Sequence, residues 1–529
     1  MFGRLVHSRV HRIVLVGGLL VAAACSSGSG VSVSTSAGPA TTDPPPTTEV
    51  GSTSEQSATG SETSSTEPEP TAPVYGPIEW DEYDDAIDVG TLEVPVDYGR
   101  PDGEQFELFL ARFNAIDQDK RIGSLLINPG GPGFGGTDYA FLAAQLFDRA
   151  LLERFDIIGW DPRGTGESDP AIDCIDDYDP YFTDIDSTPE DDAEHAELVG
   201  KAEDFARQCI GANASIIQHV GTNNSARDID AIRQALGEDQ ISFFGFSYGS
   251  ELGATWATLF PDTVRAAVLD GAADPNADAL ESSLQQMAGF QASLQTFLDR
   301  CGADPGCEFH NDGDALGAFV ELMAELDANP VPAEEGRPPV NRDVATTAVV
   351  QAMYAEAYWP ALERSLAEAQ QGNGGGLLAL HDSYYQRSFD GTYGDELEAF
   401  QVISCADTPE RKSVEEVDAE MPRFQEVAPL LVPEGTAGSY FCTFMPEALD
   451  PRVEITGEGA GPIVVIGTTG DPATPFESTV RMAEALEDGR LVVVEADQHT
   501  GYGVNRCVIE LVNDYLIDLD APDDGTECR

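Results

Sequence analysis

A serine inside a glycine-flanked pentapeptide, Gly245-Phe246-Ser247-Tyr248-Gly249, is the residue of this chain best placed for nucleophilic chemistry. An apolar run at 241–244 precedes the pentapeptide, and a helix-like segment at 251–257 follows it. This order predicts a strand, a sharp turn and a helix, with the serine oxygen lifted clear of the sheet. The glycines tolerate the crowding that such a turn imposes. In a chain with 52 glycines, however, the pentapeptide alone is also compatible with an ordinary surface turn.

A serine hydroxyl is a weak nucleophile unless a base removes its proton, and His499 is the best candidate for that base. It follows the strand-like run 491–495 and lies in the polar loop 497–503. A loop at that position can carry an imidazole over the carboxyl ends of a parallel sheet. The remaining histidines stand in less suitable contexts: His7, His11, His195, His219, His310 and His381.

A carboxylate that follows a strand is needed to orient the imidazole and to stabilise its positive charge. Asp471 comes after the strand-like run 462–467 and is the favoured acid, while Asp270, after another short apolar run, is the alternative. The chain order Ser247, Asp471, His499 is the order found in α/β-hydrolases.

A glycine-rich loop at 129–136 follows the strand-like run 124–128 and brings bare backbone amides to one place. A tetrahedral oxyanion needs two such donors, one from the residue after the nucleophile and one from a loop after an earlier strand. We expect Tyr248 and Gly131 to supply them. The alternative is that the glycines form only a tight turn.

Arg163 lies in the turn 161–168, which follows the strand-like run 154–160 and is expected to border the site. Its guanidinium is either a substrate contact or a structural ion pair with neighbouring acids. Because Asp161 and Glu167 lie close in the sequence, the ion pair is the favoured interpretation.

The alternation of strand-like and helix-like segments predicts an α/β class with a mostly parallel central sheet. Nearly two hundred residues separate Asp270 from the strand at 462, too many for a simple loop. Helix-like runs fill this interval, at 280–300, 315–328 and 345–369. We therefore predict a core at 77–275 and 456–529, with a helical cap inserted at 276–455. A cap carboxylate that binds the α-ammonium group of a peptide would restrict cleavage to its amino end.

The amino-terminal segment carries three arginines and then an uncharged stretch, which predicts a secretory signal peptide at 1–24. Cys25 follows, in a context that resembles a bacterial lipobox, although Ala22 replaces the usual leucine. Cys25 is thus a predicted lipidation site, with free secretion as the alternative. The segment 25–76 is rich in Ser, Thr, Pro and Gly, a composition typical of a disordered linker.

The chain contains nine cysteines, of which eight remain when Cys25 is set aside. An exported protein favours disulfides, and pairing between sequence neighbours predicts four bridges, although eight cysteines allow 105 connectivities. A zinc site is the rival, but the chain lacks a C-x-x-C motif, and the histidine pair His7 and His11 leaves with the predicted signal peptide. The predicted pairs are Cys174 with Cys209, Cys301 with Cys307, Cys405 with Cys442, and Cys507 with Cys528.

The net charge of -66 makes nucleic acid an improbable partner. Attraction of cationic substrates is one interpretation of the acidity. The favoured one is solubility in a saline or acidic exterior, because acidic residues are spread along the whole chain.

Five motifs together resemble the tripeptidyl aminopeptidase-like α/β-hydrolases of actinobacteria, relatives of proline iminopeptidase. They are N-P-G-G-P-G at 128–133, D-P-R-G-T-G-E-S at 161–168, G-F-S-Y-G at 245–249, V-L-D-G at 268–271 and G-D-P-A-T-P at 470–475. The resemblance extends from about Trp80 to Arg529. It implies triad roles for Ser247, Asp471 and His499, and oxyanion roles for the amides of Tyr248 and Gly131. Two features depart from the family: Gln498 replaces the usual glycine before the histidine, and no extra cysteine pair stands near residues 80–94.

The residues and the resemblance together predict an exported, monomeric serine hydrolase, either a cell-surface lipoprotein or freely secreted, that needs no metal and no cofactor. The expected substrate is a peptide with a free amino terminus, from which short peptides or single residues are released through an acyl-enzyme. The alternatives are an esterase or lipase with the same triad and, more distantly, a binding protein whose triad no longer works.

Overall fold

The computed structural model describes residues 75–529, and ten strands among them form one sheet. The predicted signal peptide, Cys25 and nearly all of the predicted linker lie outside the described residues. The sheet order is β1-β2-β3-β5-β4-β6-β7-β8-β9-β10. The strands are β1 (Trp80–Glu82), β2 (Ile87–Pro95), β3 (Gln105–Phe113), β4 (Gly123–Asn128), β5 (Phe155–Trp160), β6 (Ile241–Phe246), β7 (Val264–Asp270), β8 (Ile463–Thr468), β9 (Gly489–Val494) and β10 (Thr526–Cys528).

The sheet is mostly parallel, as the sequence predicted. Neighbouring strands run parallel from β5 through β10, whereas β1, β2 and β3 form an antiparallel edge. Every residue of β4, β5 and β8 is buried, which is why these strands read as continuous apolar runs rather than as alternating patterns.

Helices cover both faces of the sheet. Side chains of β6 alternate between them: Phe243 packs in the cluster that includes Trp256, and Phe244 in the cluster that includes Val512. The helices around the sheet are α2 (Thr137–Phe141), α3 (Ala143–Leu146), α4 (Arg149–Arg154), α6 (Thr222–Leu236), α7 (Tyr248–Leu259), α16 (Phe476–Ala485) and α17 (Arg506–Asp518).

The register of the parallel strands brings their carboxyl ends to one edge of the sheet. Asn128 pairs with Gly245, Phe246 with Asp270, and Thr468 with Val494. The loops that follow β4, β6, β7, β8 and β9 therefore leave the sheet together, as is usual for ligand sites in open α/β sheets.

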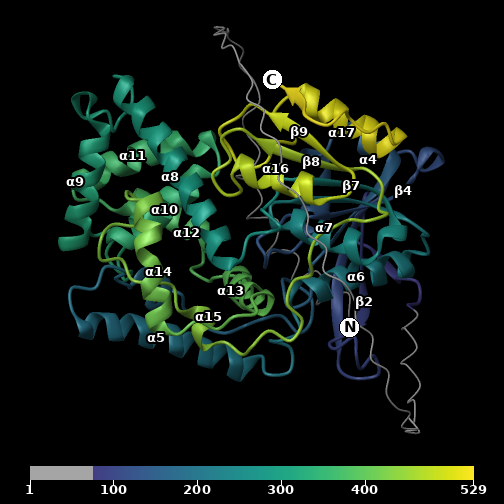
Figure 1. Ribbon diagram of the computed structural model, residues 1–529, viewed down its shortest axis with the longest axis horizontal. Helices are drawn as coiled ribbons and strands as arrows, with labels where there is room; N and C mark the ends of the chain where they lie inside the picture. Colours follow the sequence, from purple (N-terminus) through teal and green to yellow (C-terminus); the bar gives the residue numbers. More distant parts are fainter. Residues whose placement is uncertain (1–74) are drawn as a thin grey trace, which may run out of the picture.

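A helical region separates β7 from β8 and lies beside the sheet in Figure 1. It has an apolar core of its own, in which Phe297, Phe319 and Leu362 are buried. Its helices are α8 (Ala279–Ala303), α9 (Ala315–Ala328), α10 (Arg342–Met353), α11 (Trp359–Gln370), α12 (Gly375–Tyr384), α13 (Glu396–Asp407), α14 (Val414–Val427) and α15 (Phe441–Phe444).

One helix from the earlier part of the chain, α5 (Asp192–Ala212), packs with this helical region and runs beneath it in Figure 1. The ring of Phe205 on α5 meets that of Phe441 on α15 at a centroid distance of 5.0 Å. A segment from the predicted amino-terminal core thus contributes to the helical layer. Among residues 75–529, no helix has the length and apolar character needed to cross a membrane.

The helix-like run predicted at 345–369 is broken in the structure. Helix α10 ends at Met353, a short 3-10 turn, η6, covers Glu356–Tyr358, and α11 begins at Trp359. Ala355 in the break is extended, with φ -156° and ψ 141°. Its backbone forms an isolated antiparallel bridge with Gln498, a partner 143 positions further along the chain that helical periodicity cannot indicate.

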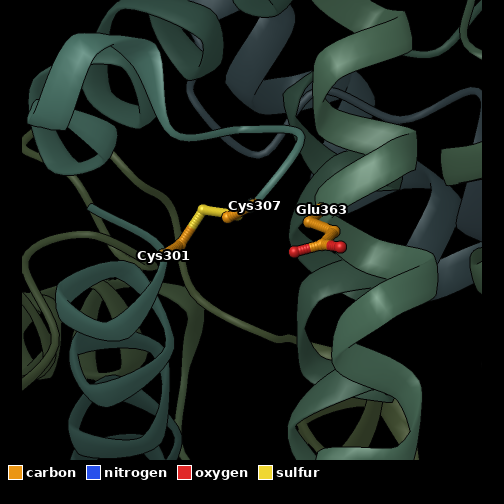
Figure 2. A group of neighbouring side chains, drawn as sticks. All are labelled: Cys301, Cys307 and Glu363. Carbon is orange, nitrogen blue, oxygen red and sulfur yellow. A yellow bond between two sulfur atoms is a disulfide. The ribbon is translucent and has the colours of Figure 1, made fainter. Parts of the chain in front are cut away.

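All eight cysteines outside the amino-terminal segment form disulfides, in the four neighbour pairs predicted. Cys301, Cys307 and Glu363 are the only group of potential metal ligands among residues 75–529, and Figure 2 shows the two sulfur atoms joined while Glu363 stands apart on α11. Sulfurs in a disulfide are unavailable as thiolates, so the zinc alternative is not supported at this position.

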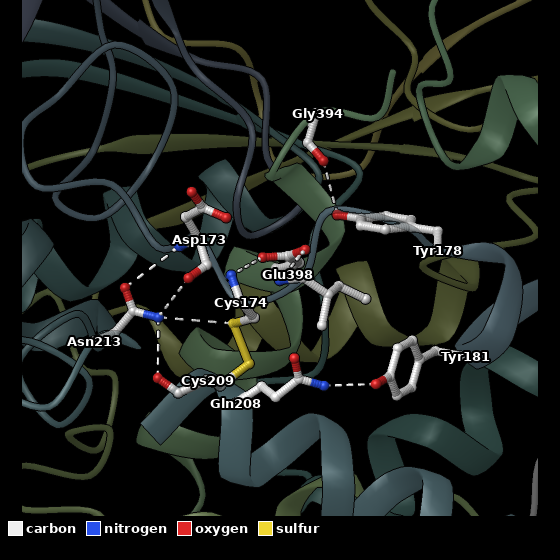
Figure 3. The surroundings of a disulfide bond; sticks show 10 residues. Asp173, Cys174, Tyr178, Tyr181, Gln208, Cys209, Asn213, Gly394 and Glu398 are labelled. Atoms are coloured by element: carbon white, nitrogen blue, oxygen red, sulfur yellow. Dashed lines mark hydrogen bonds between the residues drawn. A yellow bond between two sulfur atoms is a disulfide. The ribbon is translucent and has the colours of Figure 1, made fainter. Parts of the chain in front are cut away.

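The disulfide between Cys174 and Cys209 ties α5 to the segment that precedes it (Figure 3). Asn213 donates to the carbonyl oxygens of Asp173 and Cys209 from the same side-chain nitrogen, at 3.1 and 3.0 Å. The carboxylate of Glu398, on α13, accepts the amide of Cys174. This bridge therefore also anchors α5 to the inserted helices.

Candidate active site

Ser247 stands between β6 and α7 in the sharp turn that the pentapeptide predicted. Its backbone has φ 54° and ψ -127°, a strained conformation that few residues other than glycine adopt. A Cβ atom at Gly245 would approach the carbonyl oxygen of Gly249 to 2.1 Å, so glycine is required there. The turn leaves the side chain of Ser247 at the carboxyl edge of the sheet, partly exposed.

His499 and Asp471 lie in direct contact in the loops after β9 and β8. Nδ1 of His499 is 2.9 Å from each carboxylate oxygen of Asp471. The amides of Ala473 and Thr474 donate to the same carboxylate at 3.0 and 2.8 Å, which fixes its orientation. The carboxylate of Asp471 accepts a hydrogen bond from Nδ1, so the proton of a neutral imidazole resides on Nδ1. Nε2 is therefore the basic nitrogen.

Nε2 of His499 is buried and has no hydrogen-bond partner among residues 75–529. A buried polar atom without a partner is costly and calls for a specific explanation, such as a catalytic role or a bound water. No hydrogen bond joins Nε2 to the Ser247 hydroxyl in this structure. In apo enzymes the hydrogen bonds of a catalytic site are often long or poorly aligned, and they tighten only when substrate binds.

Asp270, the alternative acid, connects the serine turn to the histidine loop instead of contacting the imidazole. Its carbonyl oxygen accepts the amide of Ser247 at 2.8 Å. Its carboxylate accepts the amides of Gly501 and Tyr502, each at 2.7 Å. The residue therefore holds both loops at the end of β7, and the structure gives the hydrogen bond with the imidazole to Asp471.

Burial and charge shape the protonation of these groups. Burial raises the pKa of Asp270 to about 7, although the two amides lower it. Burial also disfavours the charged form of His499, but the carboxylates of Asp471 and Asp270 outweigh this effect, so the pKa of His499 lies above its ordinary value. The site thus stabilises the imidazolium that would form during proton transfer.

The glycine-rich loop passes close to Ser247. Gly130 and Gly131 have φ values of 102° and 107°, which glycine alone adopts without strain. A Cβ atom at Gly130 would lie 2.9 Å from Cβ of Ser247 and 3.0 Å from the amide nitrogen of Tyr248. Tyr248 is the first residue of α7, so its N–H has no partner within the helix. The structure therefore places Gly130, the residue before Gly131, directly beside the amide of Tyr248.

The side chain of Tyr248 is held by residues that sequence analysis did not assign to the site. Its hydroxyl lies 2.5 Å from that of Thr222, which in turn donates to Asp407 at 2.5 Å. Asp407 ends α13, so this chain of hydrogen bonds links the turn to an inserted helix. Thr474 was also missed, and its hydroxyl lies 3.3 Å from Nδ1 of His499. Spacing along one chain contains no signal for such contacts.

Arg163 forms a structural ion pair, which was the favoured interpretation, but its partner is neither Asp161 nor Glu167. The guanidinium binds Asp228 of α6 through two bonds, of 2.7 and 2.5 Å, and both side chains are completely buried. Asp161 instead accepts the hydroxyl of Thr137 at 2.7 Å. The prediction was wrong about the partner because α6, far along the chain, packs against this turn.

Comparison with known proteins agrees with this geometry. The profile of the alpha/beta hydrolase fold family matches residues 123–505. "Serine protease Hip1" of Mycobacterium tuberculosis is 36% identical over 83% of this chain and 86% of its own length. "Carboxylesterase B" of the same species is 35% identical over 83% and 85%. "Tripeptidyl aminopeptidase" of Streptomyces lividans is 27% identical over 82% and 81%.

Both the sheet and these relatives agree with the actinobacterial α/β-hydrolase resemblance drawn from the five motifs. The chain belongs to the α/β-hydrolase fold family and is a serine hydrolase.

Proposed function

We propose that this protein is an exported peptidase that releases short peptides or single residues from the free amino termini of peptides. Ser247 is the nucleophile, His499 the general base and acid, and Asp471 the group that orients the imidazole. The observation that carries the proposal is the contact of His499 with Asp471 at the edge of the sheet where Ser247 stands. This contact leaves Nε2 buried and without a hydrogen-bond partner among residues 75–529.

In the proposed reaction, Oγ of Ser247 attacks the carbonyl carbon of the scissile bond while its proton passes to Nε2 of His499. The oxyanion is stabilised by the amides of Tyr248 and Gly131. The C–N bond then breaks, and the imidazolium returns the proton to the leaving amine. Water attacks the acyl-enzyme with His499 again as base, which frees the carboxylic acid product and restores Ser247.

Selectivity for the amino end is attributed to the helices inserted at 276–455, which stand beside the site as a cap. The names of two relatives, a serine protease and a tripeptidyl aminopeptidase, support a peptide substrate. Export follows from the predicted signal peptide at 1–24, with Cys25 as the lipid-anchored residue at a cell surface. The acidity of the chain argues against a nucleic-acid partner.

The decisive experiment incubates the enzyme with one peptide in two forms, with a free and with an acetylated amino terminus, and identifies the products by mass spectrometry. Release of short amino-terminal fragments from the free peptide alone is the expected result. Equal cleavage of both forms, or cleavage at internal bonds only, would refute the exopeptidase assignment. Ser247→Ala serves as the control for a contaminating protease.

An esterase is the second candidate, since one relative is named a carboxylesterase. Esters are cleaved more easily than amides, and the same triad serves both reactions. Short and long acyl esters tested beside the peptides separate the two candidates. Hydrolysis of esters with no detectable peptide cleavage would replace the peptidase proposal by the esterase.

A further inference from the structure

The helical region makes direct contact with the loop that carries His499. The amide of His499 donates to the carbonyl oxygen of Tyr354 at 2.9 Å. Ala355 and Gln498 form an antiparallel bridge immediately beside this bond. Both contacts come from the break between α10 and α11. The ring of Tyr354 also meets the imidazole edge to face, with centroids 5.7 Å apart.

Arg300, in the last turn of α8, reinforces this contact from the side. One nitrogen of its guanidinium binds Glu356 in the break, and another binds Asp497, two residues before His499. The guanidinium also lies over the ring of Trp359, 5.1 Å from its centroid. Arg300 thus joins three segments that are far apart along the chain: α8, the start of α11 and the histidine loop.

His499 is consequently held from two sides. From the sheet, Asp471 binds its imidazole and Asp270 binds the two residues after Thr500. From the helical region, Tyr354 binds its amide and Arg300 binds Asp497. Without the contacts from Tyr354 and Arg300, the loop would be anchored only from the sheet. The imidazole would then sample positions away from Ser247.

We propose that Arg300 is a positioning residue for the imidazole: by joining Glu356 to Asp497, it keeps the break between α10 and α11 on the histidine loop and directs Nε2 toward Ser247. The inference rests on the proposed role of His499 as the base. Arg300 touches neither the serine nor the imidazole, and it acts through the loop.

The side chain of Arg300 is 52% exposed. An ion pair at such an exposed position contributes little to the free energy of unfolding. Its effect on catalysis is larger, because proton transfer depends steeply on distance. A displacement of about 1 Å at a catalytic group costs on the order of a hundredfold in rate. We therefore expect Arg300→Gln to lower kcat by roughly tenfold to a hundredfold with little change in KM.

The test compares Arg300→Gln with Arg423→Gln. Arg423 is a matched control, because its side chain is 50% exposed and it joins α14 to α8 through Glu281, away from the histidine loop. A fluorophosphonate, taken to its end point, counts the molecules with a folded site, and kcat is divided by this fraction. The expected result is a fall in kcat per labelled site for Arg300→Gln alone. A purely structural role would reduce the labelled fraction and leave kcat per site unchanged, which would overturn the inference.

Two further single substitutions and one double variant separate positioning from charge. Glu356→Gln leaves the charges of Arg300 and Asp497 in place but removes the anchor in the break. It should reproduce most of the loss, and combining it with Arg300→Gln should add little, because both act on one link. Arg300→Lys should recover part of the activity. The opposite result would have two parts: Arg300→Gln would shift the midpoint of the acidic limb in the pH profile of kcat/KM, and Glu356→Gln would be fully active. That result would show that Arg300 acts through its charge, and it would overturn the positioning role.

His499→Ala distinguishes failure of this inference from failure of the proposed function. Retained hydrolysis in His499→Ala would refute the role of the imidazole, and the inference would fall with it. Loss of hydrolysis in His499→Ala, together with equal kcat per site in Arg300→Gln and Arg423→Gln, would refute the inference alone.

Discussion

His499 and Asp471 face one another with Nδ1 2.9 Å from each carboxylate oxygen, although 28 positions separate them along the chain. The carboxylate is itself held by backbone amides. This arrangement leaves one imidazole nitrogen for proton transfer and gives it a defined direction.

Ser247→Ala should reduce turnover by about a millionfold, the scale seen when a triad nucleophile is removed. Ser250→Ala, three residues further on in α7, is a matched control, because the Ser250 hydroxyl is buried and has no hydrogen-bond partner in the described part of the chain. Turnover of both variants is measured on one peptide, with circular dichroism to check folding. Peptidase activity retained in purified Ser247→Ala would exclude the serine mechanism.

Asp471→Asn should lower kcat by about ten-thousandfold, because an amide cannot hold the imidazole in the tautomer that leaves Nε2 basic. Asp270→Asn should act mainly on stability. The carboxylate of Asp270 accepts hydrogen bonds from two backbone amides, and the NH2 group of an asparagine would face one of these donors. The buried donors left unpaired should lower the free energy of unfolding by about 1–3 kcal/mol. Denaturant unfolding and kcat are measured for both. If Asp270→Asn lost more kcat than Asp471→Asn, Asp270 would be the residue that orients the imidazole, and Asp471 would have the structural role.

The pKa of His499 should exceed 6.5, because Asp471 and Asp270 stabilise the imidazolium against the effect of burial. The neutral imidazole is the base, so kcat/KM should fall as the pH falls through this raised pKa. A raised pKa also contributes to the free energy of unfolding. This contribution is fully present below the unfolded pKa of about 6.5, and it is lost as the pH rises through the folded pKa. Since Asp270 has a pKa of about 7, the His499 signal itself should be followed by NMR. A value at or below 6.5 would contradict this electrostatic account.

Arg163→Met should destabilise the protein by about 3–5 kcal/mol, because it leaves the buried carboxylate of Asp228 without its cationic partner. The double variant with Asp228→Leu should recover part of this loss, since it removes the unpaired charge as well. Both are measured by denaturant unfolding. If Arg163 were a substrate contact, Arg163→Met would instead raise KM in a protein of unchanged stability.

The turn around Ser247 and the loops of Asp471 and His499 were predictable from sequence because each is a local pattern. A buried strand is followed by residues that tolerate a turn, and parallel strands place their carboxyl ends together. The disulfides were predictable for a related reason, since each joins cysteines that are close along the chain. In each case the informative residues lie within a few dozen positions of one another.

The amino-acid sequence by itself determined the strands that precede Ser247, Asp471 and His499, the helical character of the interval between β7 and β8, and the neighbour pairing of the cysteines. Only the tertiary structure decided that Asp228 neutralises Arg163, that Asp270 joins two loops, and that the break at Tyr354 binds the amide of His499. These contacts depend on which surfaces pack together after the helices form. Packing of distant segments leaves no periodic trace in a single sequence, so it becomes visible only in three dimensions.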